Sequence, residues 1–124
     1  MLEFFHEGGW GMYPVLVLGL MLTVSAARYA LDGEPVRLRF IGVLSLTHLA
    51  FIATALAADV AMVFWYLQSR ERVPDAELWR ILFEGLKESS RPALLGFPLL
   101  GLALILVSIG VYRVDRRELA AARA

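Results

Sequence analysis

The residues best suited to chemistry in this chain lie inside long apolar runs, where polar side chains are costly. Asp59 is the only formally charged residue in these runs, which cover residues 8–27, 40–68 and 92–112, and His48 precedes it by eleven residues. Eleven residues make about three helical turns, so the two side chains share a helix face about 16 Å apart and cannot bond directly. Carboxylates and imidazoles can relay ions across a membrane, and Thr47, Thr54 and Ser108 are the hydroxyls placed to assist. These five residues form the candidate ion pathway.

A structural role for the same residues stays open. Asp59 lies about 9 Å from the midpoint of its apolar run, so an over-long helix could hold its carboxylate in headgroup water. A single His inside a bundle commonly bonds a neighbouring helix, which makes His48 a candidate for helix packing as well. Haem ligation by His48 would need a second axial ligand from a symmetric oligomer, because His6 lies outside the apolar runs.

Several other kinds of function are excluded by what the chain lacks. It contains no Cys and no P-loop, GxSxG, HExxH or dinucleotide-binding pattern, so we expect no catalytic residues, no metal site and no cofactor. Twelve basic and twelve acidic side chains cancel without any block of like charge, so nucleic acid is not an expected partner. A chain of 124 residues with 59% hydrophobic content has no room for a soluble enzyme domain.

The elements that position these residues follow from the apolar runs. Residues 12–31, 40–67 and 93–112 are each long enough to cross the roughly 30 Å hydrocarbon layer as a helix. Residues 75–90 alternate apolar and charged positions with helical period, which predicts an amphipathic helix on the outer membrane surface or on the protein itself. The predicted fold is therefore a single all-α integral membrane domain, residues 1–124, with three transmembrane helices, an outer amphipathic interfacial helix and the lipid bilayer as its surroundings.

Small residues recur at helical spacing along the first two spans, where they would let neighbouring helices approach closely. They are Gly19, Thr23 and Ala27 in the first span and Ala50, Ala53, Ala57, Ala58 and Ala61 in the second. This pattern predicts that the second span is the helix most tightly packed by its neighbours. For the first span, a lipid-facing helix with incidental small residues is the alternative.

Basic residues near the spans predict the orientation. Three Arg residues in the first connection and four in the tail oppose five basic residues in the longer second connection. The seven are Arg28, Arg37, Arg39, Arg113, Arg116, Arg117 and Arg123, and the five are Arg70, Arg72, Arg80, Lys87 and Arg91. Because basic residues concentrate on the cytoplasmic side, this asymmetry favours the N-terminus outside and the C-terminus in the cytoplasm.

Two stretches of the chain resemble the MotA/TolQ/ExbB proton-channel superfamily. One is the opening FFHEGGWGMYPVLVLGL, and the other is LWRILFEGLKESSRPALLGFPLLGLALI, in which an EGL segment leads into a last span containing Gly and Pro. The resemblance implies a homo-oligomeric ring in a bacterial inner membrane that takes part in ion-driven energy transduction or acts as a scaffold for a single-span partner. The chain is similar to a reduced, divergent member, since about a dozen residues replace the family's large cytoplasmic segment. The alternative is a non-conducting accessory or structural subunit of a larger membrane complex.

Overall fold

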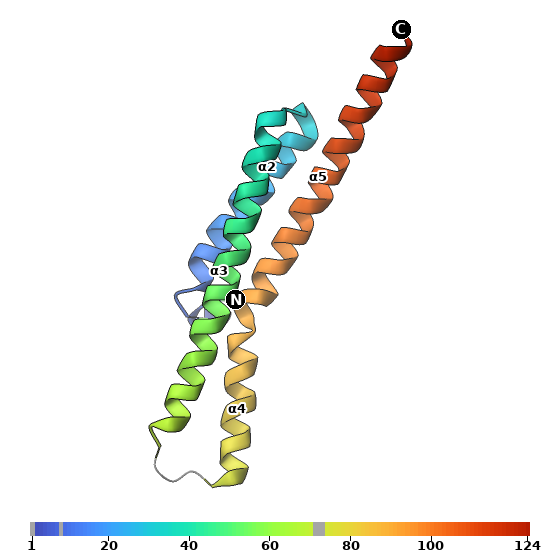
Figure 1. Ribbon diagram of the computed structural model, residues 1–124. Helices are drawn as coiled ribbons and strands as arrows, with labels where there is room; N and C mark the ends of the chain where they lie inside the picture. The colour runs from blue at the N-terminus through green and yellow to red at the C-terminus, as the bar shows by residue number, and fades with distance from the viewer. Residues whose placement is uncertain (1, 8, 71–73) are drawn as a thin grey trace.

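The computed structural model describes residues 2–7, 9–70 and 74–124, and every regular element in these ranges is an α-helix (Figure 1). In chain order the helices are α1 Leu2–Glu7, α2 Met12–Asp32, α3 Pro35–Gln68, α4 Asp75–Ser89 and α5 Arg91–Arg123. Helix α2, helix α3 and the stretch Asp75–Arg123 are each long and apolar enough to cross a membrane. The prediction of an all-α chain with three long apolar helices is confirmed.

A two-residue connection reverses the chain between α2 and α3. Gly33 adopts a φ of 71°, which L side chains avoid, and its N–H donates to the Tyr29 carbonyl at 2.8 Å. Pro35 begins α3, where its missing N–H leaves no bond unmade, and Arg37 pairs with Asp32 at 2.9 Å. The two helices form an antiparallel hairpin. Its loop is shorter than the twelve residues that separate the apolar runs 8–27 and 40–68, because α2 continues past the first run and α3 begins before the second.

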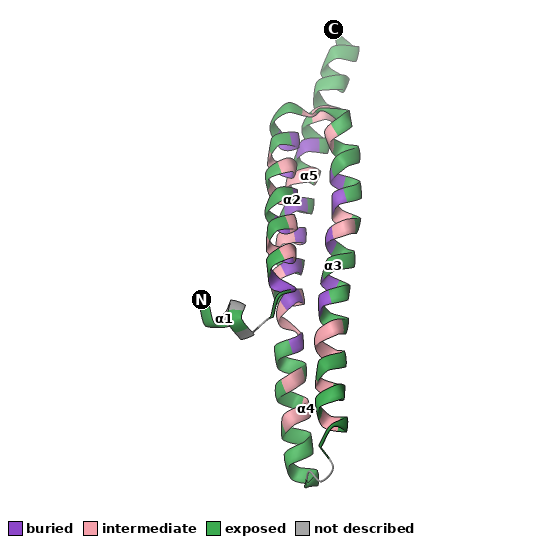
Figure 2. Ribbon diagram, turned by 90° about the vertical axis from the view of Figure 1, so that its left-hand side faces the viewer, coloured by how far each residue is buried: buried purple, intermediate pink, exposed green. Residues whose placement is uncertain are grey.

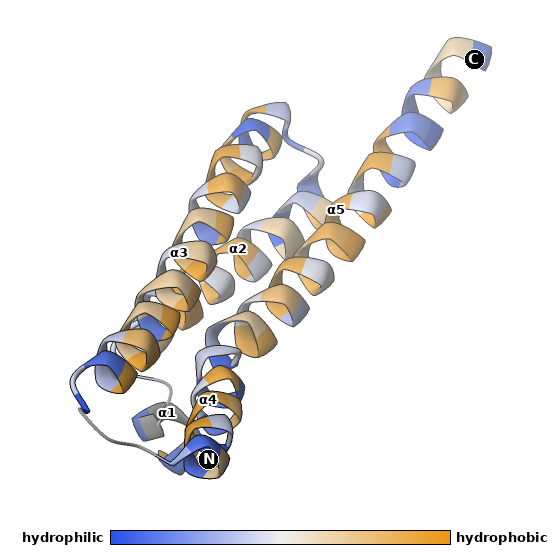
Figure 3. Cartoon of the chain, turned by 60° about the horizontal axis from the view of Figure 1, so that its bottom comes forward, coloured by the Kyte–Doolittle hydropathy of each residue, from blue (hydrophilic) through white to orange (hydrophobic). Residues whose placement is uncertain are grey.

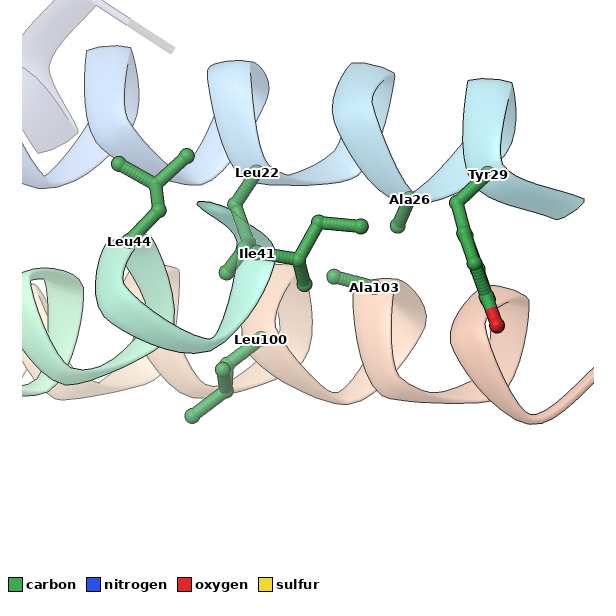
Figure 4. Packing of buried hydrophobic residues seen from close by; sticks show 7 residues of the cluster. All are labelled: Leu22, Ala26, Tyr29, Ile41, Leu44, Leu100 and Ala103. Atoms are coloured by element: carbon green, nitrogen blue, oxygen red, sulfur yellow. The ribbon is translucent and has the colours of Figure 1, made fainter. Parts of the chain in front are cut away.

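The core lies between α2, the first half of α3 and α5, and the contact of α2 with α5 is the most extensive. A cluster of buried side chains fills it, made up of Leu22, Ala26 and Tyr29 from α2, Ile41 and Leu44 from α3, and Leu100 and Ala103 from α5 (Figure 4). Glycines bring these helices close together. A Cβ at Gly110 would lie 2.7 Å from Tyr29 Cδ1, and one at Gly96 would lie 2.5 Å from Ile52 Cγ1. The absence of a side chain therefore sets the distance between the helices at both positions.

Beyond the core, the second half of α3 pairs with α4. Helix α4 runs antiparallel to α3, and α5 follows α4 nearly end to end after a break at Ser90 (Figure 1). Gly85 lets the two helices meet, because a Cβ there would lie 2.5 Å from Val63 Cγ2. At the opposite end, α5 continues past α2 to Arg123. Buried residues concentrate in the three-helix core, whereas the α3–α4 hairpin and the end of α5 are mostly exposed or half-buried (Figure 2).

The outer surface of the core is also apolar. Figure 3 shows hydrophobic residues on outward as well as inward faces of α2, α3 and α5, and Val17, Leu46 and Ile105 are among the exposed ones. Helices that are hydrophobic all round require apolar surroundings on their outer faces. The arrangement is thus compatible with a protein surrounded by lipid.

Candidate functional site

His48 lies at the centre of the three-helix core and is fully buried, with 0% of its surface exposed. Its Nε2 is 3.0 Å from the Gly96 carbonyl oxygen on α5. A carbonyl can only accept, so Nε2 is the protonated nitrogen and donates this bond. On the other side of the ring, a Cβ at Gly19 of α2 would lie 3.1 Å from His48 Cε1. The imidazole therefore occupies space left by Gly19 and bonds the backbone of Gly96, so it links α3 to both neighbouring helices.

The second ring nitrogen of His48 has a different environment. Nδ1 is buried and makes no hydrogen bond within the part of the chain that the structure describes. The bond to Gly96 uses the Nε2 proton, so Nδ1 is the ring nitrogen left without a partner. Buried polar atoms left unpaired cost free energy, so the Nε2 bond and the packing of the ring must offset that cost. The environment of His48 is that of a packing residue enclosed on all sides.

Asp59 lies at the end of the core, close to the level at which α2 begins. A Cβ at Gly9 would lie 3.8 Å from an Asp59 carboxylate oxygen, and one at Gly11 would lie 2.8 Å from Ala55 Cβ. Met12 starts α2, and Asp59 is one helical turn beyond Ala55 on α3. The carboxylate is partly exposed and makes no hydrogen bond or ion pair within the described residues. It sits where the core ends and the α3–α4 hairpin begins.

The three candidate hydroxyls each bond their own helix. Thr47 donates to the Val43 carbonyl at 3.0 Å and Thr54 to the Ala50 carbonyl at 2.8 Å. Ser108 on α5 donates to the carbonyl four residues before it, at 2.9 Å. Such bonds satisfy the hydroxyl locally and leave only its lone pairs for other partners. A single chain therefore does not connect these hydroxyls to His48 or Asp59 by any hydrogen bond among the described residues.

The small residues predicted to pack helices fall into two groups. Gly19 is buried, and a Cβ there would lie 2.5 Å from Leu99 Cδ1 on α5. Thr23 and Ala27 are half-buried on α2, and Thr23 donates to the Gly19 carbonyl at 2.8 Å. The α3 residues lie elsewhere: Ala58 is half-buried, and the exposed ones are Ala50, Ala53, Ala57 and Ala61.

Helix α3 uses a different face inside the chain. Its buried residues, all turned toward the core, are Ile41, Leu44, His48, Ile52 and Ala55. The exposed alanines fall between these positions, so they form an outward face with little side-chain bulk. Among the described residues, Ala50, Ala53 and Ala57 are left exposed and Ala61 lies at the edge facing α4, so the role of this face in packing stays a prediction about other chains.

A groove of about 900 Å³ opens beside Asp59, between the second half of α3 and α4. Its lining combines aromatic rings with carboxylates, namely Trp10, Trp65, Tyr66, Asp59, Glu84 and Glu88. This groove could not be predicted from the sequence, because its walls come from three segments far apart in the chain. The signal was the pair of aromatic residues near the end of the second apolar run, a position typical of a membrane interface.

No metal site emerges from the described ranges, in which no three His, Asp or Glu side chains gather closely enough to hold an ion. Searches among protein-family models, curated proteins and solved structures found no match to this chain. What it does is therefore inferred from its own residues and geometry.

Proposed function

We propose that this chain is an inner-membrane protein that assembles with copies of itself and holds a single-span partner, as a reduced relative of the MotA/TolQ/ExbB proteins. The observation that carries the proposal is the outward face of α3, where Ala50, Ala53, Ala57 and Ala61 are exposed although the opposite face is well packed. The two sequence stretches that resemble the superfamily support the same proposal.

The placement in the membrane follows from helix lengths. Helix α2 has 21 residues, or about 31 Å, which matches the hydrocarbon layer. Helices α3 and α5 have 34 and 33 residues, so both exceed it and project on opposite sides. The Arg distribution favours the end of α5 in the cytoplasm and the α3–α4 hairpin outside. In this placement α4 lies outside the membrane and packs along α3. Its amphipathic pattern allows a position on the membrane surface or on the protein itself, and this is the latter.

Assembly follows from the nature of the α3 face. Lipid tails provide no hydrophobic drive for helices to associate, so close van der Waals contact between small side chains supplies the attraction. Each copy offers the same outward face, so two copies can pack these faces against each other about a twofold axis. Four exposed alanines permit that close approach without any rearrangement of the core.

The scaffold role has better support than ion conduction. His48 is sealed in the core, and each candidate hydroxyl already donates to its own helix. Asp59 lies at the outer end of the core rather than midway along it. If ion conduction needs a carboxylate deep in the membrane, another chain has to supply it. An ion path, if this protein has one, forms between copies or with the partner.

The test is the mass of the purified chain together with site-directed cross-linking. The protein has no native Cys, so a single Ala57→Cys variant reports on the α3 face alone. We expect a defined oligomer in detergent and efficient disulfide formation at position 57. The matched control is Val17→Cys, which is exposed on α2 and should cross-link poorly.

A second candidate uses the same observation. A small accessory subunit could dock the α3 face onto a larger membrane complex instead of onto its own copies. A monomer in detergent that gives no disulfide at position 57 contradicts homo-oligomerisation and favours the accessory subunit.

A further inference from the structure

The groove beside Asp59 is lined by three aromatic rings, with Trp10 near its core end and Trp65 and Tyr66 farther along α3. Trp10 precedes α2 by two residues, and Trp65 and Tyr66 lie in the last turn of α3. Trp10 and Trp65 remain 70% and 65% exposed, so their ring faces are available to a ligand. The groove volume of about 900 Å³ falls within the range of small-molecule and lipid sites.

The charge of the groove has one sign. Asp59, Glu84 and Glu88 line it, and no Lys or Arg does so among the described residues. Glu84 is partly neutralised by Arg80, 3.8 Å away on the same exposed helix face. Asp59 and Glu88 have no such partner in the described part of the chain. The groove therefore complements a positive charge.

The rim already shows that this environment attracts cations. The guanidinium carbon of Arg70 lies 4.9 Å from the centre of the Tyr66 ring. Aromatic faces attract ammonium and guanidinium groups through the ring quadrupole, most strongly where water is partly excluded. Arg70 itself is not among the lining residues, so the space between the rings and Asp59 stays open.

The remaining walls are apolar. Met62, Val63 and Ile81 line the groove, and Gly85 brings α4 against α3 at its base. A ligand that fits must therefore join a cationic head to a hydrocarbon body. A free metal ion would make no contact with the apolar walls. A lipid without a cationic group would leave the carboxylates unpaired.

We propose that the groove binds a phospholipid with an ammonium headgroup, such as ethanolamine. The ammonium group lies at the core end of the groove, beside the Trp10 ring and the carboxylate of Asp59, so that the acyl chains can enter the hydrocarbon layer. The proposal rests on the membrane placement given above, which puts the groove at the outer interface. It does not depend on oligomerisation or on a partner.

The experiment is native mass spectrometry of the whole chain, purified in detergent with equal amounts of phosphatidylethanolamine and phosphatidylglycerol. We expect the protein to retain the ethanolamine lipid about tenfold over the glycerol lipid, because only the former carries an ammonium group. Asp59→Asn and Trp10→Leu should each reduce this preference at least threefold. The matched controls are Asp75→Asn and Trp79→Leu, since both residues lie outside the groove lining and should leave the preference unchanged.

The outcomes separate cleanly. Equal retention of the two lipids, or a preference that survives both groove variants, overturns the proposal. A short lysine peptide that displaces the lipid and binds in an Asp59-dependent manner also overturns it, in favour of a cationic protein segment. The same spectra report the oligomer mass, so loss of lipid preference from an intact oligomer refutes only this proposal. A lipid-selective monomer refutes only the oligomer.

Discussion

Two glycines on one helix provide a direct test of how the core is held together. Gly96 and Gly101 both lie within α5, five residues apart. A Cβ at Gly96 would meet Ile52 Cγ1 at 2.5 Å and Val15 Cγ1 at 3.0 Å, whereas a Cβ at Gly101 meets nothing within 4 Å. The same Gly→Ala change is therefore made against a packed wall in one case and into open space in the other.

The expected magnitudes follow from these distances. Replacing Gly by Ala inside a helix stabilises it by about 0.5–1 kcal/mol, which Gly101→Ala should show in full. At Gly96 the same gain is opposed by overpacking, which costs about 1–3 kcal/mol because Ile52 and Val15 are buried and have little room to move. Separation of α3 from α5 also lengthens the bond from His48 to the Gly96 carbonyl. Gly96→Ala should thus be about 1–3 kcal/mol less stable than Gly101→Ala.

The measurement is equilibrium unfolding in detergent micelles, followed by tryptophan fluorescence. Gly42→Ala on α3 is a second control, because a Cβ there also meets nothing within 4 Å. Equal stability of the Gly96 and Gly101 variants would refute the inference that glycine sets the distance between α3 and α5. A smaller effect at Gly96 after Ile52→Val, which removes the nearest methyl group, would support it.

Four other predictions concern assembly, orientation and the polar residues. His48→Phe keeps a ring but removes the bond to α5, so the free energy of unfolding in detergent should fall by about 0.5–2 kcal/mol; unchanged stability would show that this bond contributes nothing. Ala57→Leu should lower oligomer recovery in size-exclusion chromatography by holding the outward faces of α3 apart, and an unaltered oligomer mass would separate this face from assembly. Ser69→Cys should react with an impermeant thiol reagent on intact cells, and labelling only after the cells are opened would reverse the orientation. Asp59→Asn should leave both oligomer mass and proton flux in vesicles nearly unchanged, whereas loss of flux from an intact assembly would assign conduction to this residue.

Much of the helical architecture could be predicted because it depends on local pattern. An apolar run of about twenty residues has to satisfy its backbone groups internally in lipid, so its length alone indicates a spanning helix. The turn at Gly33 and Pro35 was equally readable, since one residue tolerates a positive φ and the other can begin a helix without its N–H. The amphipathic period likewise predicted a helix at 75–90, and α4 covers Asp75–Ser89.

The candidate site was harder to predict from the sequence, because it depends on which helix faces contact one another. Along α3 the small residues and the core residues alternate, and both faces are plausible contact surfaces from their composition alone. The expectation that the alanine rows of α3 are its tightly packed side does not describe the single chain, where Ala50 and Ala57 are exposed and Ile52 is buried. The face of α3 that turns toward the core is determined by glycines on the neighbouring helices, since Gly96 leaves room for Ile52 and Gly19 leaves room for His48.

The residues by themselves determined that this is an all-helical chain with three helices able to span a membrane, because run length and periodicity are local properties. Only the tertiary structure decided that His48 is sealed between Gly19 and Gly96 and that Asp59 lies beside an open groove. The two residues share a helix and a face, yet their surroundings differ because α2 begins at Met12 and does not reach past Asp59. These surroundings depend on where a neighbouring helix begins and on which of its residues are glycines. Both are relations between segments far apart in the chain, so no local sequence pattern can reveal them.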